Sequence, residues 1–187
     1  MVMDVWKQIK KKQFEPVYLL LGPESFLIKE TIQLIADNRL TEEELEFNMS
    51  TFDLTETPVQ FALEEAETFP FLGEHKLVIL QNPEFLTAEK PKEKVEHNVQ
   101  VLLDYLENPS PFCIVVIAAP YEKLDERKKV TKQLKRQSVL VDAKKLNEKE
   151  LHAWVKAQAS LHGAEFENGA VGHFIDMAGH NLMLLSN

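Results

Sequence analysis

The stretch FCIVVIA, residues 112–118, is an uninterrupted apolar run, and Ala119 and Pro120 follow it. A run of this kind, without polar alternation, is typical of a strand that is buried on both faces of a parallel sheet. Shorter apolar runs occur at VYLLL (17–21) and KLVIL (76–80), while EFNMSTF (46–52) alternates as a strand does. A last short strand is expected over residues 138–141, so the sequence predicts five strands.

Helical patterns separate these strands. After the first strand, apolar residues recur at helical spacing and Ser25 is expected to be the N-cap. Thr57, Pro58 and Gln60 predict a capping box for the next helix. Further helices are expected over 95–106 and 125–136. The alternation predicts an α/β fold: a parallel five-stranded sheet with right-handed crossovers and helices on both faces.

After Asp142 the patterns are helical only. Asn147 and Glu150 predict a capped helix, and Asn168 and Asn181 are expected to begin two more. We therefore expect an α/β domain over 1–143 and a small helical domain over 144–187. The last helix has no stop signal, and its apolar face has no evident partner, so the chain is expected to be a fragment that ends inside this second domain. That face comprises Leu182, Met183 and Leu185.

The composition is that of an ordinary soluble protein of 187 residues, with 44% hydrophobic and 27% charged residues. A single cysteine, Cys113, excludes an internal disulfide and is expected to be buried and inert. No apolar run reaches the roughly 18–20 residues needed to span a membrane. We expect a cytoplasmic protein without a membrane partner. The net charge of −9 argues against general nucleic-acid binding, and the basic residues 127–136 are interpreted as a solvated helix face in preference to a DNA contact.

The loop after the first strand lies where a phosphate-binding loop would lie in a nucleotide-binding α/β protein. Such a loop needs a second glycine, then a lysine and a hydroxyl residue. Here Gly22 and its four spacers are followed by Leu27, Ile28 and Lys29, and Lys29 is displaced by one position. We interpret these four residues as a degenerate phosphate loop that does not bind nucleotide.

Other catalytic patterns are missing. No carboxylate follows the strand over residues 112–118, where an ATPase would hold magnesium. The six histidines are scattered, so no metal site is expected, and neither are catalytic residues or a cofactor. A non-enzyme is favoured, with a P-loop-type ATPase that has an atypical nucleotide loop as the alternative.

The run Phe69-Pro-Phe-Leu72 places bulky apolar residues in a turn. Pro70 bars a helix from continuing through it, and Gly73 allows the chain to turn into the next strand. Two interpretations stay open. Phe71 and Leu72 are exposed anchors for a partner, or these side chains, Phe69 and Leu72 above all, fold back and close the edge of the sheet as part of the core.

Four segments together resemble one known family: VYLLLGPESFLIKE (17–30), ETFPFLGEHKLVIL (67–80), residues 102–135 and residues 147–182. Their order and spacing are similar to those of the delta subunits of bacterial DNA polymerase III clamp loaders. The resemblance implies an AAA+-like domain that has lost nucleotide binding, followed by a helical lid-type domain. It also implies a C-terminal collar domain, absent from this chain, through which the subunit joins the other loader subunits.

The resemblance further implies a function in DNA replication. Delta is a non-catalytic component of the DNA-directed DNA polymerase III holoenzyme, and it binds and opens the ring-shaped sliding clamp. In the family, two adjacent large apolar residues before the third strand enter a pocket on the clamp. Phe71 and Leu72 match these positions after Phe69 and Pro70, and Phe69 is an alternative anchor. DNA is expected to be contacted only indirectly, within the complex.

Overall fold

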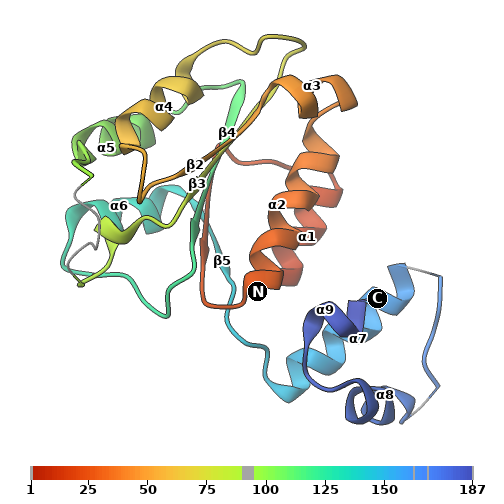
Figure 1. Ribbon diagram of the computed structural model, residues 1–187. Coiled ribbons are helices and arrows are strands. Elements are labelled where there is room, and N and C mark those ends of the chain that lie inside the picture. Colours follow the sequence, from red (N-terminus) through yellow and green to blue (C-terminus); the bar gives the residue numbers. More distant parts are fainter. Residues whose placement is uncertain (1, 90–94, 162, 168, 187) are drawn as a thin grey trace. The chain divides into compact units, whose positions relative to one another are not determined.

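The computed structural model describes residues 2–89, 95–161, 163–167 and 169–186. The chain divides into two compact units, residues 1–144 and 145–187, and each is described by itself (Figure 1). In neither unit does a described helix combine the length and the apolar character needed to cross a bilayer.

The first unit is built on a parallel five-stranded sheet of order β2-β3-β4-β1-β5. Every pair of neighbouring strands is parallel, which confirms the predicted sheet. All seven residues of the central strand β4 are buried, as the apolar run predicted, and so is Cys113 at its start. The strands are β1 (Val17–Leu21), β2 (Met49–Asp53), β3 (Lys76–Gln81), β4 (Cys113–Ala119) and β5 (Val139–Asp142).

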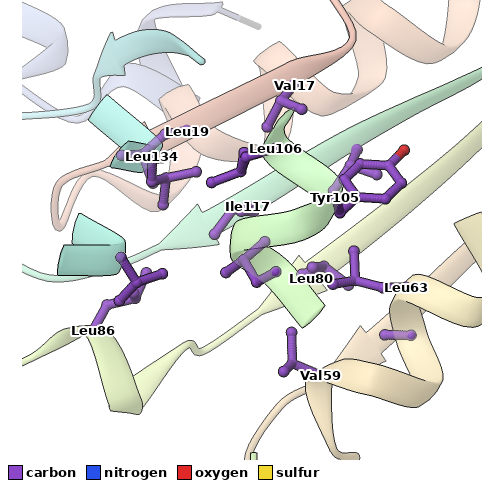
Figure 2. Packing of buried hydrophobic residues seen from close by; sticks show 14 of the residues in the cluster. Val17, Leu19, Val59, Leu63, Leu80, Leu86, Tyr105, Leu106, Ile117 and Leu134 are labelled. Atoms are coloured by element: carbon purple, nitrogen blue, oxygen red, sulfur yellow. The ribbon is translucent and has the colours of Figure 1, made fainter. Parts of the chain in front are cut away.

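Helices cover both faces of this sheet. Helices α1 (Val2–Lys10) and α2 (Ser25–Arg39) lie on one face, where the Trp6 indole donates a hydrogen bond of 2.8 Å to the Thr31 hydroxyl (Figure 1). On the other face, three helices enclose a hydrophobic core, which Figure 2 shows from close by. They are α4 (Val59–Glu67), α5 (Val99–Glu107) and α6 (Lys129–Gln137), and a short 3-10 helix, η1 (Glu84–Leu86), adds Leu86 to the same core.

The expectation of a strand over 46–52 is wrong at its first residues. Helix α3 (Glu42–Phe47) precedes β2 and contains residues 46 and 47. It begins at a complete capping box, in which the Thr41 side chain accepts from the Glu44 N–H and the Glu44 side chain accepts from the Thr41 N–H. This local signal outweighs the alternation that suggested a strand.

The caps of the next helices also differ from expectation. Glu24, not Ser25, is the N-cap of α2. Helix α4 has Pro58 as its N-cap, without a side-chain hydrogen bond, so the capping box predicted from Thr57 and Gln60 is wrong. The N–H of Val59 donates instead to Nδ1 of His97, at 3.0 Å.

Two helices begin later than predicted. Helix α5 begins at residue 99 and not 95, because the Asn98 side chain accepts from the Gln100 N–H. Helix α6 begins at residue 129 and not 125. Residues 125–127 form a turn instead, in which the Asp125 carboxylate accepts from both the backbone N–H and the guanidinium of Arg127.

The second unit contains helices α7 (Glu148–Leu161), α8 (Ala170–Ala178) and α9 (Leu182–Ser186). The predicted cap of α7 is confirmed, since Asn147 and Glu150 exchange two hydrogen bonds of 2.9 Å. Asn181 caps α9 as predicted, whereas Asn168 lies outside the described residues. Leu182 and Leu185 are buried, so the expectation that they lack a partner is wrong, while Met183 is exposed.

Candidate functional site

The apolar run Phe69–Leu72 and the degenerate phosphate loop that begins at Gly22 lie at opposite edges of the sheet. Residues 68–75, here called the anchor loop, connect α4 to the start of β3, whereas Gly22 directly follows the end of β1. All strands run in the same direction, so one loop lies at the amino edge and the other at the carboxyl edge. Figure 1 shows the anchor loop arching from α4 toward α3.

The anchor loop presents large apolar side chains to solvent. Phe69 is 82% exposed, Phe71 is 75% exposed and Leu72 is 38% exposed, while Pro70 is half-buried. A Phe side chain stabilises a core when it is buried, and the side chains of Phe69 and Phe71 are not buried. The interpretation in which the run is part of the core is therefore wrong for Phe71, while Phe69 is largely exposed and keeps only a contact with the edge of the sheet.

Neighbouring aromatic rings nevertheless restrict both phenylalanines. The Phe71 ring centroid lies 5.8 Å from that of Phe47 in α3, and Phe47 is itself 50% exposed. The Phe69 ring centroid lies 5.0 Å from that of Phe112, the residue just before β4. Both separations are within the range of favourable aromatic contacts. Phe69 thus rests on the edge of the sheet with one face and offers the remainder of its surface to solvent.

Two buried polar residues, Asn48 and Glu44, hold the backbone beneath these side chains. Oδ1 of Asn48 accepts from the N–H groups of Phe71, at 3.0 Å, and Leu72, at 3.4 Å. Its Nδ2 donates to the carbonyl oxygens of Leu72 and of His75, the latter at 2.9 Å. The single side-chain amide of Asn48 therefore fixes three residues of the anchor loop.

Glu44 fixes the next part of the loop. Its Oε1 accepts from the N–H groups of Glu74, at 2.7 Å, and His75, at 2.8 Å, while Oε2 accepts from Thr41. Burial acts to raise the pKa of Glu44, but these three backbone donors outweigh it and leave the pKa below its ordinary value. Gly73 has a φ of +69°, and a Cβ there would overlap the Glu44 carboxylate. Glycine is therefore required at this turn.

The other end of the loop is attached through Lys76, the first residue of β3, which is almost completely buried. Its ammonium group donates to the Glu65 carboxylate at 2.7 Å, to the Glu65 carbonyl at 3.0 Å and to the Thr68 hydroxyl at 2.7 Å. These contacts join the last turn of α4 to the start of β3.

The surroundings of the anchor loop are acidic. Residues 40–75 contain no lysine or arginine but include several exposed acidic residues on α3, α4 and the loop itself. These residues are Glu42, Glu43, Glu46, Glu64, Glu67 and Glu74. An apolar surface with this border is complementary to an apolar pocket bordered by basic residues.

At the opposite edge, the loop after β1 is closed by its own backbone. The N–H of Gly22 donates to the Ala119 carbonyl at 3.1 Å, and the N–H of Glu24 donates to the Ala143 carbonyl at 2.9 Å. A working phosphate loop turns such donors toward its ligand. The Glu24 carboxylate also accepts from the N–H of Phe26 at the start of α2. Its negative charge would repel an anionic ligand from this helix end.

The remaining loop residues lie as the sequence suggested. Leu27 and Ile28 are buried in α2, and Lys29 is exposed. A Cβ at Gly22 would collide with the carbonyl of Ala143, so this glycine serves close packing against the chain after β5. Within the described part of the chain, no three His, Cys, Asp or Glu side chains converge as a metal site would require.

Sequence reasoning identified the exposed apolar residues but missed Glu44, Phe47 and Asn48. The capping-box pattern at Thr41 and Glu44 was available and would have placed α3. No local sequence pattern predicts the role of Asn48, because its hydrogen-bond partners lie 23 to 27 positions further along the chain.

Comparison with known proteins decides the family. Residues 18–144, more than half of the chain, match the family model described as DNA polymerase III, delta subunit. The chain belongs to the DNA polymerase III delta subunit family. A curated delta subunit from Bacillus subtilis is 53% identical over 150 residues, which are 80% of this chain and 43% of that protein.

Solved structures agree with this assignment. The Bacillus subtilis DNA clamp loader delta protein matches with a TM-score of 0.92 and 45% identity, over 100% of this chain and 55% of its own. The RuvB Holliday junction branch migration motor of Thermotoga maritima matches with a TM-score of 0.53 and 14% identity, over 99% of this chain and 58% of its own. That distant likeness supports the AAA+-like fold alone. This delta-family chain spans about half the length of the two Bacillus subtilis relatives that it matches.

Proposed function

We propose that this chain is the clamp-binding part of a clamp loader delta subunit, which binds the sliding clamp of DNA polymerase III and opens it during DNA replication. The observation that carries the proposal is the exposure of Phe69, Phe71 and Leu72 on a loop whose backbone is held by buried hydrogen bonds. Phe71 and Leu72 are the expected anchors, with Phe69 and Pro70 beside them.

The physical role of these residues follows from the energetics of interfaces. A few large side chains that enter a pocket carry most of the affinity, at roughly 2 kcal/mol or more each. Ordering the loop before binding lowers the entropy that the complex must lose. The subunit opens a ring only to the extent that it binds the open form more tightly than the closed one. This requires no catalysis by the chain itself.

The proposal includes further partners. Assembly with the other loader subunits would use a collar domain outside residues 1–187, and DNA would be contacted indirectly within the loader. The alternative of a P-loop-type ATPase has no support in the loop after β1, where Gly22 and Glu24 donate their N–H groups to backbone carbonyls.

A binding measurement tests the proposal. We expect the chain to bind purified sliding clamp of the bacterial DNA polymerase III, and Phe71→Ala with Leu72→Ala to weaken binding by about 30-fold or more. The matched control is Met177→Ala, which truncates an exposed apolar side chain of the second unit. Equal affinity of the double variant and the unmodified chain, measured by surface plasmon resonance, would show that the anchors are wrongly assigned.

A further inference from the structure

The anchor loop combines two properties that rarely occur together. Its side chains are exposed, whereas its backbone polar groups are bonded to buried side chains. Exposed loops usually satisfy their backbone groups with water, but here the N–H groups of Phe71, Leu72, Glu74 and His75 all donate to Asn48 or Glu44. The loop is therefore attached to α3 and to the start of β2, not only to the two elements that it connects.

Asn48 is placed to transmit this restraint. It is fully buried between α3 and β2, and both ends of its amide are used, with the oxygen accepting twice and the nitrogen donating twice. A side chain whose four hydrogen bonds all go to one loop contributes mainly to the conformation of that loop. None of its atoms is available to a partner, so any effect on binding passes through Phe71 and Leu72.

Glu44 restrains the other half of the turn. It is buried, it belongs to the capping box of α3, and it accepts from Glu74 and His75 with the oxygen against which Gly73 packs. The same carboxylate thus fixes the start of α3 and the turn of the anchor loop. Phe47 of α3 lies against the Phe71 ring, so α3 supports the backbone and one side chain of the loop.

We infer that Asn48 and Glu44 are positioning residues, which hold the anchor loop in its binding conformation before the partner arrives. The expected consequence, tighter binding of the sliding clamp, rests on the proposed function. The restraint on the loop is a property of the free chain and does not depend on that function. Replacing Asn48 removes no atom from the interface and still weakens binding, because the loop must then be ordered during association.

The test has two readouts. In the free chain, hydrogen exchange of the Phe71, Leu72, Glu74 and His75 amides is expected to be slow, and Asn48→Ala is expected to accelerate it at Phe71 and Leu72. Toward purified sliding clamp, Asn48→Ala is expected to lose about tenfold in affinity. Asn48→Asp keeps the acceptor for Phe71 and Leu72 but places a buried carboxylate oxygen against the carbonyls of Leu72 and His75, so a loss at least as large as that of Asn48→Ala is expected.

A double-mutant cycle separates positioning from general damage. Asn48→Ala should cost less affinity in the Phe71→Ala background than in the unmodified chain, because its effect passes through that anchor. The matched control is Gln133→Ala, which removes another buried amide, on α6, that donates to the Leu103 carbonyl. It is expected to lower stability without changing affinity.

Each outcome decides the inference. Fast exchange of the four amides in the unmodified chain overturns it, even if a variant fails to fold. Additive losses in the cycle, or unchanged affinity of Asn48→Ala, overturn it as well. If the unmodified chain does not bind the clamp at all, the proposed function fails, and the exchange measurement still decides whether the loop is held in advance.

Discussion

Lys76 illustrates how one buried charge stabilises the base of the anchor loop. Its ammonium group makes three hydrogen bonds, to the carboxylate and the carbonyl of Glu65 and to the Thr68 hydroxyl. The carbonyl belongs to the last turn of α4 and also accepts from the N–H and the hydroxyl of Thr68, the C-cap of that helix. The Glu65 side chain is 37% exposed, so water can solvate that carboxylate if the lysine is removed.

We therefore expect Lys76→Met to reduce the free energy of unfolding by about 1–3 kcal/mol, because the apolar stem is kept while the three hydrogen bonds of the buried ammonium group are lost. Urea denaturation of both chains measures the difference. Lys29→Met is the matched control, since Lys29 is exposed and its replacement should change stability by less than about 0.5 kcal/mol. Equal stability of the Lys76→Met variant and the unmodified chain would contradict this account.

Among the elements, α4 depends on a cap that comes from a distant part of the chain. Nδ1 of His97 accepts from the N–H of Val59, and the Gln60 side chain accepts from the N–H of Asn98. The His97 ring also lies 4.7 Å from the Phe85 ring. The residues just before α5 therefore fix the first turn of α4, the helix that leads into the anchor loop.

This cap predicts a pH dependence. Desolvation by burial holds the pKa of His97 below its ordinary value of 6.5, although a hydrogen bond with Leu54 partly opposes it. The unfolded chain then binds more protons as the pH falls, so stabilisation present above pH 6.5 is lost progressively as the pH drops through the folded pKa. We expect His97→Gln, which does not titrate, to show a weaker loss of stability than the unmodified chain.

Thermal unfolding at about pH 7.5 and about pH 5.5 measures this difference, and NMR titration of the ring gives the pKa directly. The other histidines titrate in both chains and so cancel in the comparison. A pKa for His97 at or above the ordinary value, or identical pH profiles for the two chains, would contradict the prediction.

Elements and long-range contacts were not equally predictable from the sequence. The strands β1, β3 and β4 follow from apolar runs, because burial on both faces leaves no place for polar residues. Helix α3 was missed because its last two residues begin the alternating run 46–52, while its capping box, Thr41 and Glu44, lies before that run. The exposure of Phe69 and Phe71 could be anticipated because Pro70 excludes a helix through this run. The residues that hold them could not, because Glu44 and His75 lie 31 positions apart.

At the scale of the whole molecule, the two edges of the sheet have separate roles. At the carboxyl edge, the chain ends of β1, β4 and β5 bond to one another through Gly22, Ala119 and Ala143 and leave the loop closed. At the amino edge, α3 and the anchor loop form the exposed apolar surface. The loop after β1 is thus held by backbone hydrogen bonds, and the surface that we propose for binding lies entirely within residues 1–144.

This separation predicts that a chain ending at Lys144 folds and binds the sliding clamp as tightly as the full chain. The first unit contains the complete sheet, its helices on both faces and every residue that holds the anchor loop. The large buried side chains of residues 145–187, such as Trp154, Ile175 and Leu182, belong to the second unit. Circular dichroism and surface plasmon resonance on both chains test the prediction. An unfolded shortened chain would show that the first unit needs the second in order to fold. A shortened chain that is folded but binds about tenfold more weakly would show that the second unit contributes to the site.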